Sequence, residues 1–344
     1  MRKHYIDNLK WMIILVLIPY HAGMAFNAWG EPNYIMLDSD KLISSFLVFF
    51  SPWFMPLLFL LAGTNTSYSI QKRGTTTYLK DRTKRLLLPF VIGVLILMPV
   101  QCYMADVFNY RYSGNLFSHY GRFFRITDLS GSDGCFSVGH YWFLIYLYII
   151  SIIGLLLIKI IGNPPMKIAS VNSFILFALW IPLPFISDIL SIGGKSLLEY
   201  TYLFLVGYYI FSNDATLDYL ESKRLITLII GLMSSITNIY LFLWADYPHH
   251  LLNIAANYIA EWFMILALIG YWKKYFDFSN AFTHFMTKNS FGFYFIHYVC
   301  VVGAEFFVCK CVHNHLAIFL LTSLLSYILV FSIIALVQNH PHFK

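Results

Sequence analysis

The stretch "DNLKWMIILVLIPYH", residues Asp7 to His21, decides how this chain is interpreted. An acid and a base open an apolar run, and Pro19 and His21 lie inside it, where hydrocarbon side chains would be easier to bury. An ionisable residue near the centre of a bilayer costs several kcal/mol and usually faces a protein interior or a wet cavity. His21 is therefore the first candidate for a functional site.

The composition is that of a polytopic membrane protein. Of the 344 residues, 59% are hydrophobic and 12% are charged, whereas soluble domains carry about a quarter of charged residues. Apolar windows of about 20 residues, the length that crosses a bilayer, recur along the whole chain. We predict one all-α membrane domain, residues 1–344, with about ten transmembrane helices. The expected spans are about 11–30, 43–70, 86–105, 141–161, 168–187, 197–212, 225–245, 250–271, 289–309 and 315–337.

The distribution of positive charge predicts the orientation. With both termini cytoplasmic, 17 of the 23 Lys and Arg residues fall on the inner side, and six fall outside. This asymmetry follows the positive-inside rule, so the net charge of +6 indicates membrane lipids rather than nucleic acid as partners. We expect a multi-pass protein of the cell (inner, cytoplasmic) membrane. No His/Cys cluster has metal spacing, so no metal is expected.

Pro19 and His21 give the first helix a polar centre. Pro19 removes a backbone donor and leaves the carbonyl of Leu15 without its helical partner. Successive residues of an α-helix are rotated by about 100° around its axis, so Lys10 and Asp7 project from the helix within about 20° and about 40° of the direction of His21. Two interpretations stay open: a ligand along this helix touches all three residues, or His21 only bonds a neighbouring helix while Asp7 and Lys10 anchor the helix end.

Four motifs, in order along the chain, resemble those of the membrane acyltransferase-3 family. The opening "YIDNLKWMIILVLIPYH" is similar to its first-helix pattern of Asp, basic residue and His, although the family usually has Arg where this chain has Lys10. "FLLAGTNTSYSIQKRG" and "YLKDRTKRLLLPF" resemble its second helix and third-helix start, with Arg-x-x-Arg at Arg82 and Arg85. "GHYWFLIYLYIIS" resembles its Gly-His segment, and "NSFGFYFIHY" its late Tyr-x-x-His helix.

The resemblance implies an integral membrane O-acyltransferase. Such an enzyme moves an acyl group from cytoplasmic acyl-CoA, here acetyl-CoA or succinyl-CoA as co-substrate, to a hydroxyl of a glycan or related acceptor. The segments "KRLLLPFVIGVLILMPVQCY" and "PHHLLNIAANYIAEWFMILALIGYWKKYF" most resemble the glucan-modifying subgroup, which includes periplasmic glucan succinyltransferases. His21 is then the expected general base, and Asp7 and Lys10, on the same face of the first helix, are expected to act with it in catalysis. The alternative is that His21 forms a covalent acyl-histidine intermediate.

The other motif residues have expected binding roles and simpler alternatives. Arg82 and Arg85, three apart, can fork onto the phosphates of acyl-CoA, with Lys84 beside them; alternatively they only set topology and touch lipid head groups. The candidates for binding the acceptor are His140, Trp142, Tyr294 and His297. Each of them could instead have a structural role, as a helix cap, as a side chain at the membrane interface or as part of the packed core.

Two other classes of protein compete with the enzyme. An exporter or flippase of a lipid-linked sugar would also need a polar cavity and ionisable groups within the membrane. A structural subunit would leave His21 and Pro19 unexplained. The combination of a phosphate-binding pair with a buried base favours the enzyme.

Overall fold

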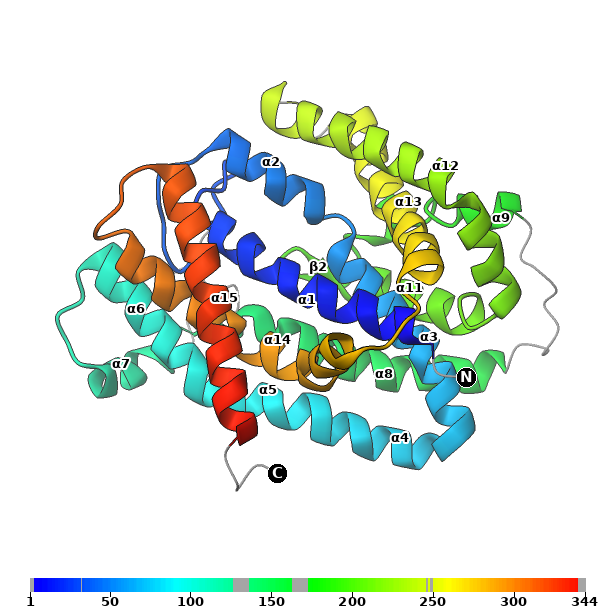
Figure 1. The fold of residues 1–344 in the computed structure, drawn as a ribbon, viewed down its shortest axis with the longest axis horizontal. Helices are drawn as coiled ribbons and strands as arrows, with labels where there is room; N and C mark the ends of the chain where they lie inside the picture. The colour runs from blue at the N-terminus through cyan, green and yellow to red at the C-terminus, as the bar shows by residue number, and fades with distance from the viewer. Residues whose placement is uncertain are drawn as a thin grey trace. The chain divides into compact units, whose positions relative to one another are not determined.

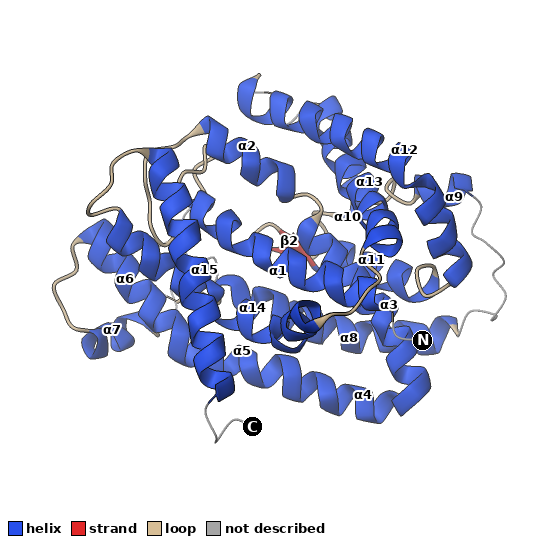
Figure 2. Cartoon of the chain, viewed as in Figure 1, coloured by secondary structure: helices blue, strands red, loops and turns tan. Residues whose placement is uncertain are grey.

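A computed structural model describes residues 3–31, 33–125, 136–162, 173–245, 247 and 250–339 of the chain. Helices make up most of the described chain (Figure 2). The first half contains α1 (His4–Met24), α2 (Lys41–Phe50), α3 (Phe54–Arg73), α4 (Thr75–Arg82), α5 (Leu88–Ile92), α6 (Met98–Tyr110), α7 (Leu116–Phe123) and α8 (Trp142–Ile161). The second half contains α9 (Ser173–Ala178), α10 (Leu183–Ile186), α11 (Leu197–Tyr209), α12 (Asp214–Ile239), α13 (Leu251–Tyr275), α14 (Ala281–Val308) and α15 (His315–Asn339).

Seven helical stretches of the described chain are long and apolar enough to cross a membrane. They are Lys41–Arg73, Thr75–Tyr110, Gly139–Ile161, Asp214–Trp244, Leu251–Tyr275, Ala281–Val308 and His315–Gln338. They match seven of the ten expected spans, which confirms a helical multi-pass membrane protein.

The other three expected spans stay predictions. The helix α1 has 21 residues, but Asp7, Asn8, Lys10 and His21 dilute its hydropathy. The helix α11 has only 13 residues. The expected fifth span is represented by the short helices α9 and α10, and its residues 168–172 lie outside the described chain.

The third expected span begins earlier than predicted. We placed its start near residue 86, whereas a continuous helical stretch runs from Thr75 to Tyr110. Gly74, with φ of 75°, separates it from α3, because glycine adopts positive φ without steric cost. The stretch contains two π-helical segments, η1 (Thr83–Leu87) and η2 (Gly93–Leu97). The basic segment before residue 86 is therefore largely helical rather than an irregular loop.

One small hairpin departs from the helical architecture. The strands β1 (Ser191–Ile192) and β2 (Lys195–Ser196) pair antiparallel. Gly193 and Gly194 join them with φ of 57° and 72°, and positive φ at both central residues is typical of the tight turn that connects two strands. The hairpin leads directly into α11.

The described chain divides into two compact units, each built from three segments. Unit 1 comprises Met1–Leu9, Val48–Leu88 and Phe143–Ser279; unit 2 comprises Lys10–Leu47, Pro89–Trp142 and Asn280–Lys344. In unit 1, α12 packs along α13 and α3 packs along α11 (Figure 1). A side chain on Gly63 or Gly207 would collide with the backbone carbonyl of Phe204 or Leu60. These two glycines let α3 and α11 approach backbone to backbone, as small residues do between membrane helices.

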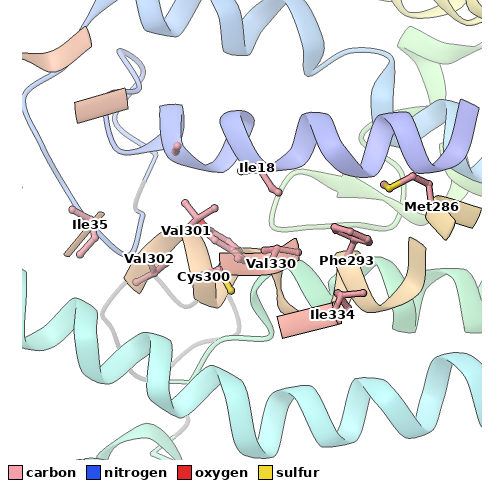
Figure 3. Packing of buried hydrophobic residues seen from close by; sticks show 11 residues of the cluster. Ile18, Ile35, Met286, Phe293, Cys300, Val301, Val302, Val330 and Ile334 are labelled. Atoms are coloured by element: carbon pink, nitrogen blue, oxygen red, sulfur yellow. The ribbon is translucent and has the colours of Figure 1, made fainter. Parts of the chain in front are cut away.

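Unit 2 has an apolar core between α1, α14 and α15. Ile18 of α1 faces Val301 of α14 and Val330 of α15 in this core, and all three are buried (Figure 3). The segment that follows α1 adds Ile35 to the same cluster. The core holds the inward faces of α1 and α14 against each other, and these faces also carry the polar residues described next.

Candidate active site

Three histidines from distant parts of the sequence meet inside unit 2. His21 lies on α1, His297 on α14, and His140 in the 3-10 turn η3 (Gly139–Tyr141). The ring centroids are 5.3 Å apart for His21 and His297, 4.9 Å for His140 and His297, and 6.5 Å for His21 and His140. His140 and His297 are buried and His21 is partly buried. The sequence predicted each residue separately; the structure shows that they form one cluster.

Pro19 gives α1 its polar centre, as expected. The carbonyl of Leu15, which loses its helical partner because Pro19 has no N–H, accepts a hydrogen bond of 2.8 Å from the hydroxyl of Tyr327 on α15. The helix remains continuous through this point to Met24. Proline therefore does not interrupt α1, and α15 satisfies the carbonyl that proline releases.

Gly139 explains how His140 reaches the cluster. Gly139 has φ of 47°, and a Cβ there would lie 2.7 Å from Cε of Met98 and 2.8 Å from the hydroxyl oxygen of Tyr34. Only glycine fits both the backbone conformation and the space. The turn fixes the backbone of His140, whose carbonyl accepts a hydrogen bond of 2.5 Å from the hydroxyl of Tyr294 on α14.

A backbone hydrogen bond determines the tautomer of His297. Its Nδ1 lies 2.6 Å from the backbone carbonyl oxygen of Tyr294. A carbonyl oxygen can only accept, so Nδ1 carries the proton and Nε2 of the neutral ring presents a lone pair. Nε2 is buried and has no hydrogen-bond partner among the described residues. His297 therefore presents a buried hydrogen-bond acceptor whose position is fixed.

Nδ1 of His21 is also buried without a partner among the described residues, and neither nitrogen of His140 makes a well-aligned hydrogen bond there, although the backbone carbonyls of Tyr294 and Phe295 lie near its ring. Buried polar atoms in native proteins are normally hydrogen-bonded to protein or water. Several unpaired nitrogens on three adjoining rings indicate a place where a polar ligand or water completes the hydrogen bonding. Among the described residues, no group of three His, Cys, Asp or Glu side chains is arranged to hold a metal ion.

The remaining predicted catalytic residues share α1 with His21. Asp7 and Lys10 lie near the start of this helix, and both are partly buried. Trp142 is the first residue of α8, directly after the turn that carries His140. The polar segment of about residues 106–139, which the predicted orientation places on the outer side, contains α7, while its residues 126–135 lie outside the described chain.

The predicted donor-binding cations lie in unit 1 and have two kinds of environment. Arg82 is half-buried; its guanidinium lies 4.9 Å from the ring centroid of Tyr78, and its Nη2 donates to Oγ1 of Thr66 at 3.4 Å. Lys84 and Arg85 are exposed and belong to the π-helical segment η1. The α-helical spacing that we assumed for the arginine pair does not hold there, since a π-helix pairs residues i and i+5.

Sequence reasoning missed two buried residues: Tyr298, which contacts the cluster, and Gln101 on another helix of unit 2. The ring of Tyr298 stacks on His21, with centroids 3.8 Å apart and an interplanar angle of 19°. Gln101 on α6 is fully buried, and neither of its amide atoms has a hydrogen-bond partner among the described residues. Tyr298 directly follows the Tyr-x-x-His motif, so its position was the one available signal; an isolated Gln in an apolar span gave none.

A second buried polar group ties α7 to α6. Oδ2 of Asp106 lies 2.9 Å from Nε2 of His119 and 3.0 Å from Nε of Arg122. Asp106 and His119 are fully buried, and the ring of His119 packs edge-on against Tyr112. This group lies in the segment expected to face the outer side, and it fixes the position of α7 there.

The comparisons with known proteins identify the family of the chain. Residues 3–337 match the acyltransferase-3 family, described as an acyltransferase domain, and the chain belongs to this family. It is a multi-pass membrane protein and an O-acyltransferase. Neither a curated protein nor a solved structure is significantly similar to the chain.

Proposed function

We propose that this enzyme transfers an acetyl or succinyl group from cytoplasmic acyl-CoA to a hydroxyl of a glycan or related acceptor, with His21 as general base. The observation that carries this proposal is the meeting of His21, His140 and His297, whose buried ring nitrogens include several without a hydrogen-bond partner among the described residues. An ester-forming transfer needs a base for the hydroxyl and fixed groups that position both substrates. The cluster offers both in one place.

The reaction is balanced without any further reagent. The acceptor hydroxyl gives its proton to a ring nitrogen of His21 as its oxygen attacks the thioester carbonyl. The carbon–oxygen bond forms, the carbon–sulfur bond breaks, and the proton passes from His21 to the departing CoA thiolate. A covalent acyl-histidine would split the same transfer into two steps. Asp7 and Lys10, on the same helix as His21, are proposed to orient the donor along α1.

The fixed lone pair of His297 supports an acceptor with more than one hydroxyl. The reacting hydroxyl has a single proton, which goes to His21. Nε2 of His297, being an acceptor, then needs a donor from elsewhere, and a neighbouring hydroxyl of a sugar supplies one. His140 offers two further ring nitrogens for binding the acceptor. Trp142 lies two positions after it in the sequence, and the hydroxyl of Tyr294 donates a hydrogen bond to its carbonyl. A glycan acceptor fits this need better than a simple alcohol.

Arg82, Lys84 and Arg85 are proposed to bind the phosphates of CoA on the cytoplasmic side. The exposed Lys84 and Arg85 present charge to solvent, while Tyr78 and Thr66 hold the Arg82 guanidinium. Guanidinium groups make strong, directional contacts to phosphate.

The positive-inside asymmetry supports cytoplasmic termini, about ten crossings and a place in the inner membrane. We further propose one functional domain, lipid partners and membership of the glucan-modifying subgroup.

The test is acyl transfer by the purified protein in vesicles, with acetyl-CoA and succinyl-CoA as donors and a glucan as acceptor. His21→Ala is expected to lower the rate by about two to four powers of ten. His284→Ala, an exposed histidine on α14, is the matched control and should keep wild-type activity. Transfer by His21→Ala within a few-fold of wild type would remove the proposed base. Movement of a lipid-linked sugar without ester formation would instead support the exporter.

A further inference from the structure

The ring of Tyr298 covers one face of His21. The two rings are nearly parallel, with an interplanar angle of 19° and centroids 3.8 Å apart. Tyr298 is buried on α14, next to His297. A histidine ring turns about a broad, weakly restricted torsion, so its orientation depends on what surrounds it. Nδ1 of His21 has no hydrogen-bond partner among the described residues. The stack on Tyr298 is closer than the ring contacts of His21 with Tyr20 and His297, whose centroids lie 5.6 Å and 5.3 Å away, so it restricts the plane of the ring most.

Tyr298 is itself held by the segment between α1 and α2. Its hydroxyl donates to Oδ1 of Asn33 at 2.6 Å, and Nδ2 of Asn33 donates to the carbonyl of Ile35 at 3.3 Å. Tyr34 packs edge-on against Tyr298, with centroids 5.1 Å apart. Ile35 is fully buried in the core of unit 2. The chain from Asn33 to Ile35 thus anchors Tyr298 in the same core that holds α1.

We propose that Tyr298 is a positioning residue for His21, and that Asn33 fixes Tyr298 in place. The stack keeps the imidazole in one plane, so that its ring nitrogen stays aimed at the acceptor hydroxyl through the transfer. Small misplacements of a reacting group lower rates strongly, because the reacting atoms must lie close and aligned. This inference rests on the proposed function, since it presumes that His21 is the base.

The hydroxyl of Tyr298 and its ring have separable roles. Tyr298→Phe removes the bond to Asn33 and keeps the stacking surface. Tyr298→Leu removes the stacking surface as well. Asn33→Ala removes the same hydrogen bond from the other side. If the bond acts only by holding the ring, then the double variant Asn33→Ala/Tyr298→Phe should be no worse than either single variant, because both remove one interaction.

The experiment measures kcat and the Michaelis constants for acyl-CoA and acceptor in reconstituted vesicles. Tyr298→Leu is expected to lower kcat by about 10- to 100-fold while both Michaelis constants stay near wild type. Tyr298→Phe and Asn33→Ala should each cause a smaller loss of kcat. Phe293→Leu, which removes another buried ring of α14 in contact with Phe331, is the control and should leave kcat unchanged.

The outcomes separate this inference from the proposed function. An inactive His21→Ala together with a fully active Tyr298→Leu would overturn the positioning role and leave the base in place. An active His21→Ala would overturn the base itself. Thermal unfolding in detergent shows whether Tyr298→Leu folds. If it does not, the double-mutant cycle of Asn33→Ala and Tyr298→Phe tests the positioning role instead. Additive losses of kcat in the two variants, or no loss at all, would contradict the proposed coupling.

Discussion

The hydroxyl of Tyr327 donates to the backbone carbonyl of Leu15 at 2.8 Å. This carbonyl is the one that Pro19 leaves without a helical partner, six residues before His21. The bond joins α15 to the middle of α1, about 1.7 turns from the candidate base. It shows how a proline is accommodated inside the helix that carries the candidate base: a hydrogen bond from a side chain of a neighbouring helix replaces the backbone hydrogen bond that proline cannot make.

Tyr327→Phe is expected to destabilise the protein by about 1 kcal/mol or more, the cost of leaving a partly buried carbonyl oxygen without a donor. The measurement is thermal or denaturant unfolding in detergent. The matched control is the same substitution in a Pro19→Ala background. Alanine restores an N–H for the carbonyl of Leu15, so Tyr327→Phe should cost much less there. An equal loss in both backgrounds would mean that Tyr327 stabilises the protein by packing alone.

His297→Phe tests the fixed lone pair of His297. Phenylalanine keeps an aromatic ring on α14 and removes the acceptor nitrogen. We expect the Michaelis constant for the acceptor to rise roughly 3- to 10-fold, which corresponds to about 0.5–1.5 kcal/mol for one hydrogen bond, with little change in that for acyl-CoA. Steady-state kinetics with each substrate varied in turn checks this. An effect on the acyl-CoA constant alone would place His297 on the donor side of the reaction.

Replacing Arg82 and Arg85 together by Gln tests the donor site. Charge-assisted contacts to phosphate contribute about 1.5–3 kcal/mol each, mainly as binding of a remote part of the donor. The Michaelis constant for acyl-CoA should rise, with a smaller effect on the acceptor and some loss of turnover. Kinetics in oriented vesicles, with acyl-CoA supplied to one face at a time, provides the measurement. Lys72→Gln, an exposed cation of α3, serves as the control. Activity only with acyl-CoA on the outer face would reverse the proposed arrangement.

Gly207→Ala tests the close packing of α3 and α11 in unit 1. The new methyl group would collide with the backbone carbonyl of Leu60, and backbone cannot move aside as a side chain can, so we expect a large loss of stability and of membrane-inserted protein. Gly292→Ala on α14 is the control. Its methyl group would meet Cδ1 of Ile334 at 2.7 Å, and the end of this flexible side chain can shift. Equal stability of the two variants would show that α3 and α11 can separate without cost.

The sequence determined the class of protein and much of the candidate site. Apolar windows predicted seven spans that the structure also shows, because the length and hydropathy of a membrane helix follow from the thickness of the bilayer. Pro19 by itself predicted that the carbonyl of Leu15 has no helical hydrogen bond, because proline lacks the backbone N–H that would donate to it. The motifs named His21, His140 and His297 as candidates. Helix ends were less predictable: a glycine and two π-helical segments extended the third span toward Thr75.

Only the tertiary structure decided what these residues do together. It brought the three histidines into one cluster, gave the carbonyl of Leu15 to Tyr327, and fixed the tautomer of His297 through the carbonyl of Tyr294. It also placed Tyr298 on His21, although 277 positions separate them in the sequence. Hydropathy depends on each segment by itself, so it can be read along the chain. A ring stack or a buried hydrogen bond depends on which faces of two helices meet, and that is set by the packing of the whole core.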